Sequence, residues 1–258
     1  IMAKWTAFPH ADKHYEYSPA TLKKHWARLH RGDCEPFPKD DAVAAAWIDY
    51  HAGRFQQAAE AGLKAGAAGL NVASKATNIY ANYLEKSEKK KLEMFQEVAA
   101  RCAAQQATDP KNANAYYHYA YAIGRYGQGI SVTKALAQGL GGKVRDALTR
   151  AIELAPKHAD AHIALGAFHA EVIDKVGAMI GAMTYGAKRD EGLRLFRKAL
   201  ELNPDSAIAR IEYANALVML EGKKALKEAE ALYGEAAAFA PMDAMERLDV
   251  EMARSEID

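Results

Sequence analysis

The sequence predicts an all-α fold, and three observations support this prediction. Alanine, the residue with the highest helix propensity, accounts for 55 of the 258 residues. Small and aromatic side chains supply most of the apolar content, so few β-branched residues remain to build the strands of a sheet. Gly, Pro and Asp residues divide the chain into helix-length segments, and none of these segments has the pattern of a strand.

Residues 1–40 are expected to form an irregular arm followed by a capping helix. The arm, residues 1–18, is rich in aromatic side chains, namely Trp5, Phe8, Tyr15 and Tyr17. A helix should begin after Ser18, because Ser is a favoured N-cap and Pro19 suits the first helical position. Its apolar stripe consists of Leu22, Trp26 and Leu29, and Gly32 should end it.

Residues 41–258 are expected to form one continuous domain of antiparallel helical hairpins. Asp40 or Asp41 should cap the first helix, which stops at Gly53, and residues 54–65 should be its partner. Further breaks are predicted at Gly69, Ser87, Asp109-Pro110, Gly127–Gly129, Gly139–Gly142, Pro156, Gly186, Pro204, Gly222 and Pro241.

A recurrent phrase ends at Pro156, at Pro204 and at Pro241, and a weaker version ends at Pro110. In the stronger copies a bulky residue lies eight positions before the Pro and an Ala lies five before it. The pairs are Leu148 with Ala151, Phe196 with Ala199, and Tyr233 with Ala236. A small residue allows two helices to cross closely, and Pro ends the second helix.

The phrase resembles the closing signature of the tetratricopeptide repeat, and the resemblance covers residues 41–241. It implies a right-handed superhelix of antiparallel helix hairpins with a concave binding groove. The distances between successive Pro residues are 46, 48 and 37, whereas the family repeat has 34 residues. The extra residues fall at Tyr126–Gly142 and Val172–Ala187, are largely apolar, and should lengthen the hairpins. In this layout the chain is similar to the regulator-of-microtubule-dynamics proteins and to the repeat lipoprotein of some TRAP transporters, in which repeats surround an apolar groove or pore.

The repeat register predicts which side chains face the groove. The first helices of successive hairpins contribute Tyr117, Tyr121, Arg125, Ile163, Glu171, Ile211, Asn215 and Met219, and the second insertion contributes Ile173, Met179, Met183 and Tyr185. Tyrosines and aliphatic residues dominate this set, which disfavours a clamp for a peptide carboxylate and favours an apolar ligand or an amphipathic helix. The alternative is that these side chains are core residues of long hairpins.

The leading functional hypothesis is a non-enzymatic scaffold that holds a protein partner, either a peptide or an amphipathic helix, in its groove. The alternative is a carrier of an apolar small molecule, such as a lipid, in a channel between the long hairpins. No nucleophile elbow, phosphate-binding loop or dinucleotide fingerprint is present, so neither an enzyme nor a cofactor is expected. The histidine groups around His25 and His158 invite a metal hypothesis, but without a third ligand at suitable spacing we expect no metal site.

Charge and hydropathy limit the remaining functions. A net charge of +1 gives no reason to expect a nucleic acid partner. The longest uncharged apolar stretch, Val176–Ala187, is too short to span a membrane. The N-terminus shows no signal core and the two Cys form no paired motif, so a cytoplasmic protein is expected. The basic N-terminal and acidic C-terminal ends either attract each other within one chain or associate head to tail in a homo-oligomer.

Overall fold

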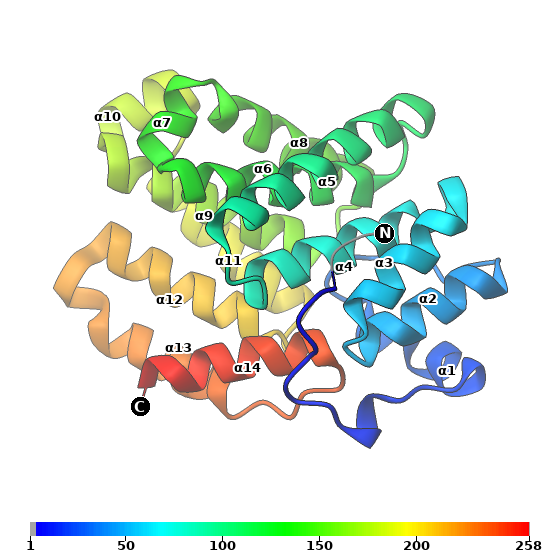
Figure 1. Cartoon of the computed structure of the whole chain (residues 1–258). Helices are drawn as coiled ribbons and strands as arrows, with labels where there is room; N and C mark the ends of the chain where they lie inside the picture. Colours follow the sequence, from blue (N-terminus) through cyan, green and yellow to red (C-terminus); the bar gives the residue numbers. More distant parts are fainter. Residues whose placement is uncertain (1–3, 258) are drawn as a thin grey trace.

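A computed structural model describes residues 4–257, and in this range the chain is helical with no strand. The helices pair as antiparallel hairpins, and successive hairpins stack around a common centre (Figure 1). The predicted all-α superhelix is confirmed. None of the described helices combines the length and the hydropathy that a bilayer crossing requires.

The N-terminal part contains a short 3-10 helix, η1 (Lys13–Tyr15), and the helices α1 (Pro19–Leu29), α2 (Asp41–His51), α3 (Phe55–Lys64) and α4 (Leu70–Tyr83), with η2 (Gly66–Gly69) before α4. Ser18 caps α1 as predicted and forms a reciprocal capping box with Thr21. The side chain of Asp40 accepts a hydrogen bond from the backbone N–H of Ala42 and so caps α2. These start signals are local, which is why the sequence alone located them.

The middle part consists of α5 (Glu88–Thr108), α6 (Ala113–Ile130), α7 (Val132–Ala137) and α8 (Leu140–Leu154). The predicted break at Gly127–Gly129 is wrong, because α6 continues through both glycines to Ile130. Here the glycines do not form a turn. They allow neighbouring helices to approach closely. A Cβ atom on Gly127 would lie 2.9 Å from that of Ala135, and one on Gly129 would lie 2.7 Å from Leu92.

The C-terminal part begins with α9 (Ala159–Val176), the single turn α10 (Ala178–Ile180) and the π-helical turn η3 (Gly181–Tyr185). It continues with α11 (Arg189–Leu202), α12 (Ala207–Glu221), η4 (Gly222–Ala225), α13 (Leu226–Ala237) and α14 (Ala244–Ile257). The two apolar insertions lengthen their hairpins as expected, since α6 and α9 have 18 residues each while α11 has 14.

The alanines of the repeat phrase lie where helices cross. Ala151, Ala199 and Ala236 are completely buried. Phe196 lies in the same core cluster as Ala199, and a Cβ on Gly166 of α9 would lie 2.8 Å from its ring. Close backbone approach at these positions therefore requires Ala or Gly.

Helix α14 closes the superhelix against its N-terminal helices. The Arg28 guanidinium pairs with Glu246 at 2.6 Å, and the Tyr17 hydroxyl donates to the carbonyl of Met242 at 2.8 Å. The opposite charges at the two ends of the chain thus attract each other within one molecule. The arm covers the same region, where Trp5 stacks on Tyr80 with ring centroids 4.2 Å apart.

Candidate binding pocket at the centre of the superhelix

A pocket of about 160 Å³ lies at the centre of the superhelix. Helices α4, α6, α9, α12 and α14 form one part of its wall, and α6, α7, α8 and α9 form the other. The two parts differ in chemistry, so we describe them as a polar lobe and an apolar lobe.

The apolar lobe lies under the inserted helix α7. Its wall is formed by Val132, Leu136, Leu140, Val144, Leu148, Phe168 and Val172. Gly124 of α6 also lines the pocket, and a Cβ placed on it would meet no atom within 4 Å. Because Gly124 carries no side chain, the space beside this point of α6 stays open.

The polar lobe is organised around Arg125 of α6. Its guanidinium pairs with Glu212 at 3.1 Å, donates to the amide oxygen of Gln128 at 3.0 Å, and lies 5.4 Å from the ring centre of Tyr121. The Gln128 amide in turn donates to Glu171. This chain of contacts holds side chains from α6, α9 and α12 in fixed positions.

Carboxyl groups outnumber cations in the polar lobe. Its cations are Lys75 and Arg125, and its carboxyl groups are Asp160, Glu171, Glu212 and Asp249. Lys75 is already paired with Asp33, with its Nζ 2.5 Å from the carboxylate. Burial raises the pKa of Asp160 to about 7, and it also raises the pKa of Glu171 and of Asp249.

Two polar atoms of the wall lack a partner. Among the described side chains, the amide oxygen of Asn78 and the Nε2 atom of His118 are buried without a hydrogen bond, and both residues line the pocket. Burial lowers the pKa of His118 to about 3, so its ring is neutral. Unsatisfied polar atoms of this kind are rare in protein interiors and call for an explanation.

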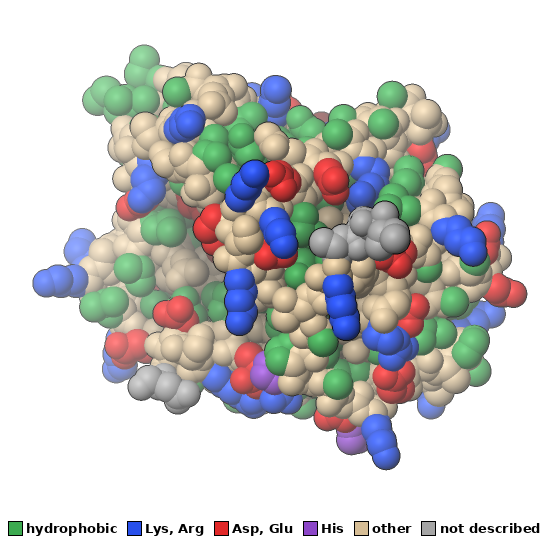
Figure 2. Space-filling view, viewed as in Figure 1, with side chains coloured by type: hydrophobic (Ala, Val, Ile, Leu, Met, Phe, Trp, Pro, Cys, Tyr) green, Lys and Arg blue, Asp and Glu red, His purple; other side chains and the backbone are tan. Residues whose placement is uncertain are grey.

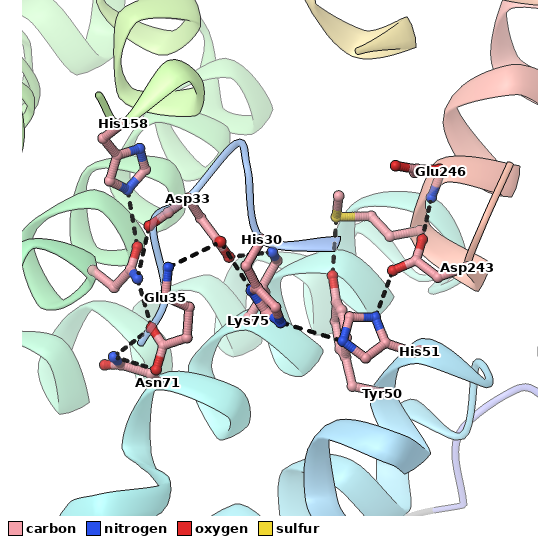
Figure 3. A network of polar contacts seen from close by, with 12 residues as sticks. His30, Asp33, Glu35, Tyr50, His51, Asn71, Lys75, His158, Asp243 and Glu246 are labelled. Carbon is pink, nitrogen blue, oxygen red and sulfur yellow. Dashed lines mark hydrogen bonds and ion pairs between the residues drawn. The ribbon is translucent and has the colours of Figure 1, made fainter. Parts of the chain in front are cut away.

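A buried polar network supports the wall on the side of Lys75 (Figure 3). Asp33 accepts from Lys75 and contacts His30 at 2.9 Å, and the rings of His30 and His51 meet through their Nε2 atoms at 3.2 Å. His51 continues to Asp243 at 2.6 Å, just before α14. The network therefore joins the loop after α1 to α2, α4 and the start of α14.

A second branch of the network runs toward α9. Glu35 accepts from Asn71 at 2.8 Å and from Asn114 at 2.6 Å, and Asn114 contacts His158 at 2.9 Å. His158 also accepts from the N–H of Ala161 and so caps α9. Its two ring nitrogens are both engaged in structural hydrogen bonds. Within residues 4–257, no group of three His, Cys, Asp or Glu side chains could hold a metal ion.

The structure brings together part of the set predicted to line the groove. The residues that line the pocket are Tyr117, Tyr121, Arg125, Ile163 and Glu171. The others lie elsewhere: Ile173 and Tyr185 are half-buried against the core around α8 and α9, Ile211 is buried between α12 and α13, and Asn215 accepts from Tyr233. Met179, Met183 and Met219 are exposed.

Sequence reasoning missed the residues of the pocket that come from distant elements. Lys75, Asp160 and Asp249 were not among the expected residues. A signal existed for Lys75, because it is the single charged residue of an otherwise uncharged helix, α4. Gly124 had no recognisable signal, since its role depends on the empty space beside it.

Residues 64–254 match the family described as regulator of microtubule dynamics protein 1-3. No curated protein sequence matches the chain. Among solved structures, the chain is similar to the thermophilic TPR protein TTC0263 of Thermus thermophilus, with 19% identity, a TM-score of 0.57, and coverage of 83% of this chain and 98% of that one. This likeness shows the tetratricopeptide-repeat fold.

Two further solved structures are more distant. The TPR protein YrrB, described as having an unusual peptide-binding site, is 14% identical with a TM-score of 0.42, and the alignment covers 92% of this chain and 100% of that one. The TPR2AB domain of yeast Sti1, solved in a complex with pHSP90, is 18% identical with a TM-score of 0.33, over 92% and 86% of the two chains.

Proposed function

This chain belongs to the regulator of microtubule dynamics protein 1-3 family, and from its central pocket we propose that it is a non-catalytic binding protein for a single-chain amphiphile. The observation that carries the proposal is the division of one pocket into an apolar and a polar lobe, with the open position of Gly124 on its wall. An apolar chain fits the lobe under α7, and a polar head fits the lobe around Arg125.

The polar lobe favours a head group that donates hydrogen bonds and carries no negative charge. The two cations of the lobe already have carboxylate partners, Asp33 for Lys75 and Glu212 for Arg125. The carboxyl group of Asp160, by contrast, is half-buried in the wall of the pocket, and desolvation raises its pKa to about 7. An approaching ammonium group would favour ionisation of this carboxyl group, whereas an anionic head group would raise its pKa further and would find both cations already paired with carboxylates.

The unpartnered amide oxygen of Asn78 supports the same choice of head group. A buried acceptor without a donor costs about 1–3 kcal/mol, and an N–H or O–H group of a ligand would remove that cost. The lining therefore contains a buried acceptor that a donor on the ligand would satisfy. We propose a long-chain amine, or a neutral amphiphile with a hydroxyl or amide head, as the ligand class.

The first test is ligand binding by the full chain. Native mass spectrometry and calorimetry should show that a single-chain alkylamine binds more tightly than the alkyl carboxylate of the same length. Asp160→Asn should reduce this preference by about tenfold, because it removes a carboxyl group of the pocket wall that would pair with the ammonium. Equal affinities for amine and carboxylate would contradict the proposed head group.

The second test fills part of the pocket with a side chain. Gly124→Leu places a side chain into the open space on α6, so it should abolish binding while the chain stays folded. Gly234→Leu is the matched control, because Gly234 also lies inside a helix, α13, with no atom near its Cβ position, but is exposed to solvent away from the pocket. Loss of binding in both variants, or in neither, would contradict this location for the ligand.

A second candidate function is the scaffold that the repeat phrase implies. The observation in its favour is an exposed apolar pair, Val218 and Met219, at the end of α12. In this case a peptide or an amphipathic helix contacts the concave tyrosines, and Tyr117→Ala combined with Tyr121→Ala should release it in a pull-down. Retention of every partner by the double variant would argue against the scaffold. The mass measured in the native spectrum also reports whether the chain forms a homo-oligomer.

A further inference from the structure

The second insertion ends in an apolar tip, residues 177–186. Three large apolar side chains of the tip are solvent-exposed: Met179 by 76%, Ile180 by 54% and Met183 by 83%. No charged residue occurs between Lys175 and Lys188. Exposed apolar side chains are common singly, but a contiguous group of them marks an interaction surface.

The backbone of the tip turns these side chains outward. Gly177 and Gly186 both have positive φ angles, 81° and 69°, and reverse the chain at either end of the tip. Gly181 faces inward, where its Cβ position lies 3.5 Å from both Val172 and Ile173 of α9. The inner side of the tip is therefore packed, and Met179, Ile180 and Met183 remain on the outer side.

The protruding shape of the tip is suited to a lipid bilayer. In Figure 2 the hydrophobic side chains at the upper left, over α10, project beyond the neighbouring surface. A protruding point needs a matching hollow in a protein partner, whereas a bilayer surface accommodates it without one. Unbranched methionine side chains adapt readily to such an environment.

The charges around the tip fit an anionic surface. The nearby acidic residues Asp146, Asp174 and Asp190 are each paired with the adjacent Arg or Lys, at 2.8 Å in every case. Among the ion pairs of residues 4–257, none involves Lys134 of α7, Lys143 of α8 or Lys188 at the start of α11. These lysines lie on the elements around the tip and are free to face lipid phosphates.

From the exposed, uncharged tip and the unpaired lysines beside it, we propose that the chain docks on bilayers that contain anionic lipids. Met179, Ile180 and Met183 enter the region between head groups and acyl chains, and the lysines contact the head groups. The docking proposal does not depend on the proposed ligand. If that proposed function holds, docking also places the apolar lobe near the hydrocarbon, because α9 lines the lobe and contacts the tip directly.

The test is flotation of the full chain with vesicles of phosphatidylcholine alone and of phosphatidylcholine mixed with phosphatidylserine. The chain should float with the mixed vesicles and much less with phosphatidylcholine alone, and high salt should weaken the association. Met179→Asp combined with Met183→Asp should reduce the partition coefficient by about tenfold or more, since it replaces apolar insertion with charge. Leu63→Asp, at an exposed Leu of α3, is the control and should leave flotation unchanged.

Three outcomes would overturn the docking proposal. They are no flotation with either vesicle, equal flotation of the tip variant and the control, and equal flotation with both vesicle compositions. A dimer in native mass spectrometry that the tip variant dissociates, without vesicle binding, would assign the tip to self-association instead. Gly124→Leu separates the two proposals, because it should float like the unmodified chain even when it has lost its ligand.

Discussion

The N-terminal hairpins and the middle hairpins share one backbone layout but fill their centres differently. Between α2 and α4 the centre is filled by large side chains, with Trp47 and Tyr50 fully buried and Lys75 ion-paired beside them. Between α6 and α9 the facing positions include Gly124, Gly127 and Ala167, and a pocket remains. Side-chain volume at the facing positions therefore contributes to whether a repeat encloses a core or a binding site.

The largest effect is expected from removing the charge at the centre of the filled region. Lys75→Met leaves Asp33 buried without its cation and should lower the free energy of unfolding by about 3–5 kcal/mol. Urea denaturation measures the change. Lys91→Met, which breaks a solvent-exposed pair with Glu88, is the control and should cost less than about 1 kcal/mol. Similar losses in the two variants would show that the buried pair is not essential to the filled centre.

The next effect concerns pH and the same network. Burial and the nearby Asp33 raise the pKa of Glu35 to about 7, above its ordinary value of 4.5. The folded state therefore holds this proton more tightly, and the contribution of Glu35 to stability falls as the pH rises from about 4.5 through 7. Glu35→Gln lacks this titration, so its stability relative to the unmodified chain should increase over that interval, by up to about 3 kcal/mol. If the free energy of unfolding changed by the same amount between pH 5 and pH 8 in the unmodified chain and in Glu35→Gln, the raised pKa of Glu35 would be contradicted.

A smaller effect distinguishes packed from open glycines. Gly166→Ala brings a methyl group against the ring of Phe196 and should destabilise the chain by about 1–3 kcal/mol. Gly124→Ala meets open space within a helix, so it should stabilise the chain by about 0.5–1 kcal/mol. Thermal unfolding of the two variants shows whether each substitution raises or lowers the stability. Destabilisation by Gly124→Ala would mean that the space beside α6 is closed in solution.

The smallest effect is expected at the tip. Met183→Asp changes a side chain that is mostly exposed, so the free energy of unfolding should change by less than about 0.5 kcal/mol. Calorimetry of the purified variant and of the unmodified chain measures this change. A large loss of stability would assign Met183 to the packing of the hairpin and not to an external surface.

Features set by neighbouring residues could be predicted from the sequence. The cap at Ser18, the hairpin lengths and the buried alanines of the repeat phrase all depend on spacing within a few turns. Pairs between distant residues could not be predicted. In the sequence, Asp33 and Lys75 cannot be distinguished from charged surface residues, because only the fold buries them against each other. The same holds for the pocket, whose apolar lobe depends on where the inserted α7 lies and whose polar lobe depends on where α14 lies.

The closure by α14 has a consequence for how the chain folds. Repeat proteins ordinarily have low contact order, because each hairpin contacts only its neighbours and folding spreads from any point. Here Tyr17 bonds to Met242, 225 residues away, and His51 contacts Asp243, 192 residues away. These contacts add a loop-closure cost that a linear array avoids. The closed chain should therefore unfold in a single cooperative transition, without fraying of hairpins from either end.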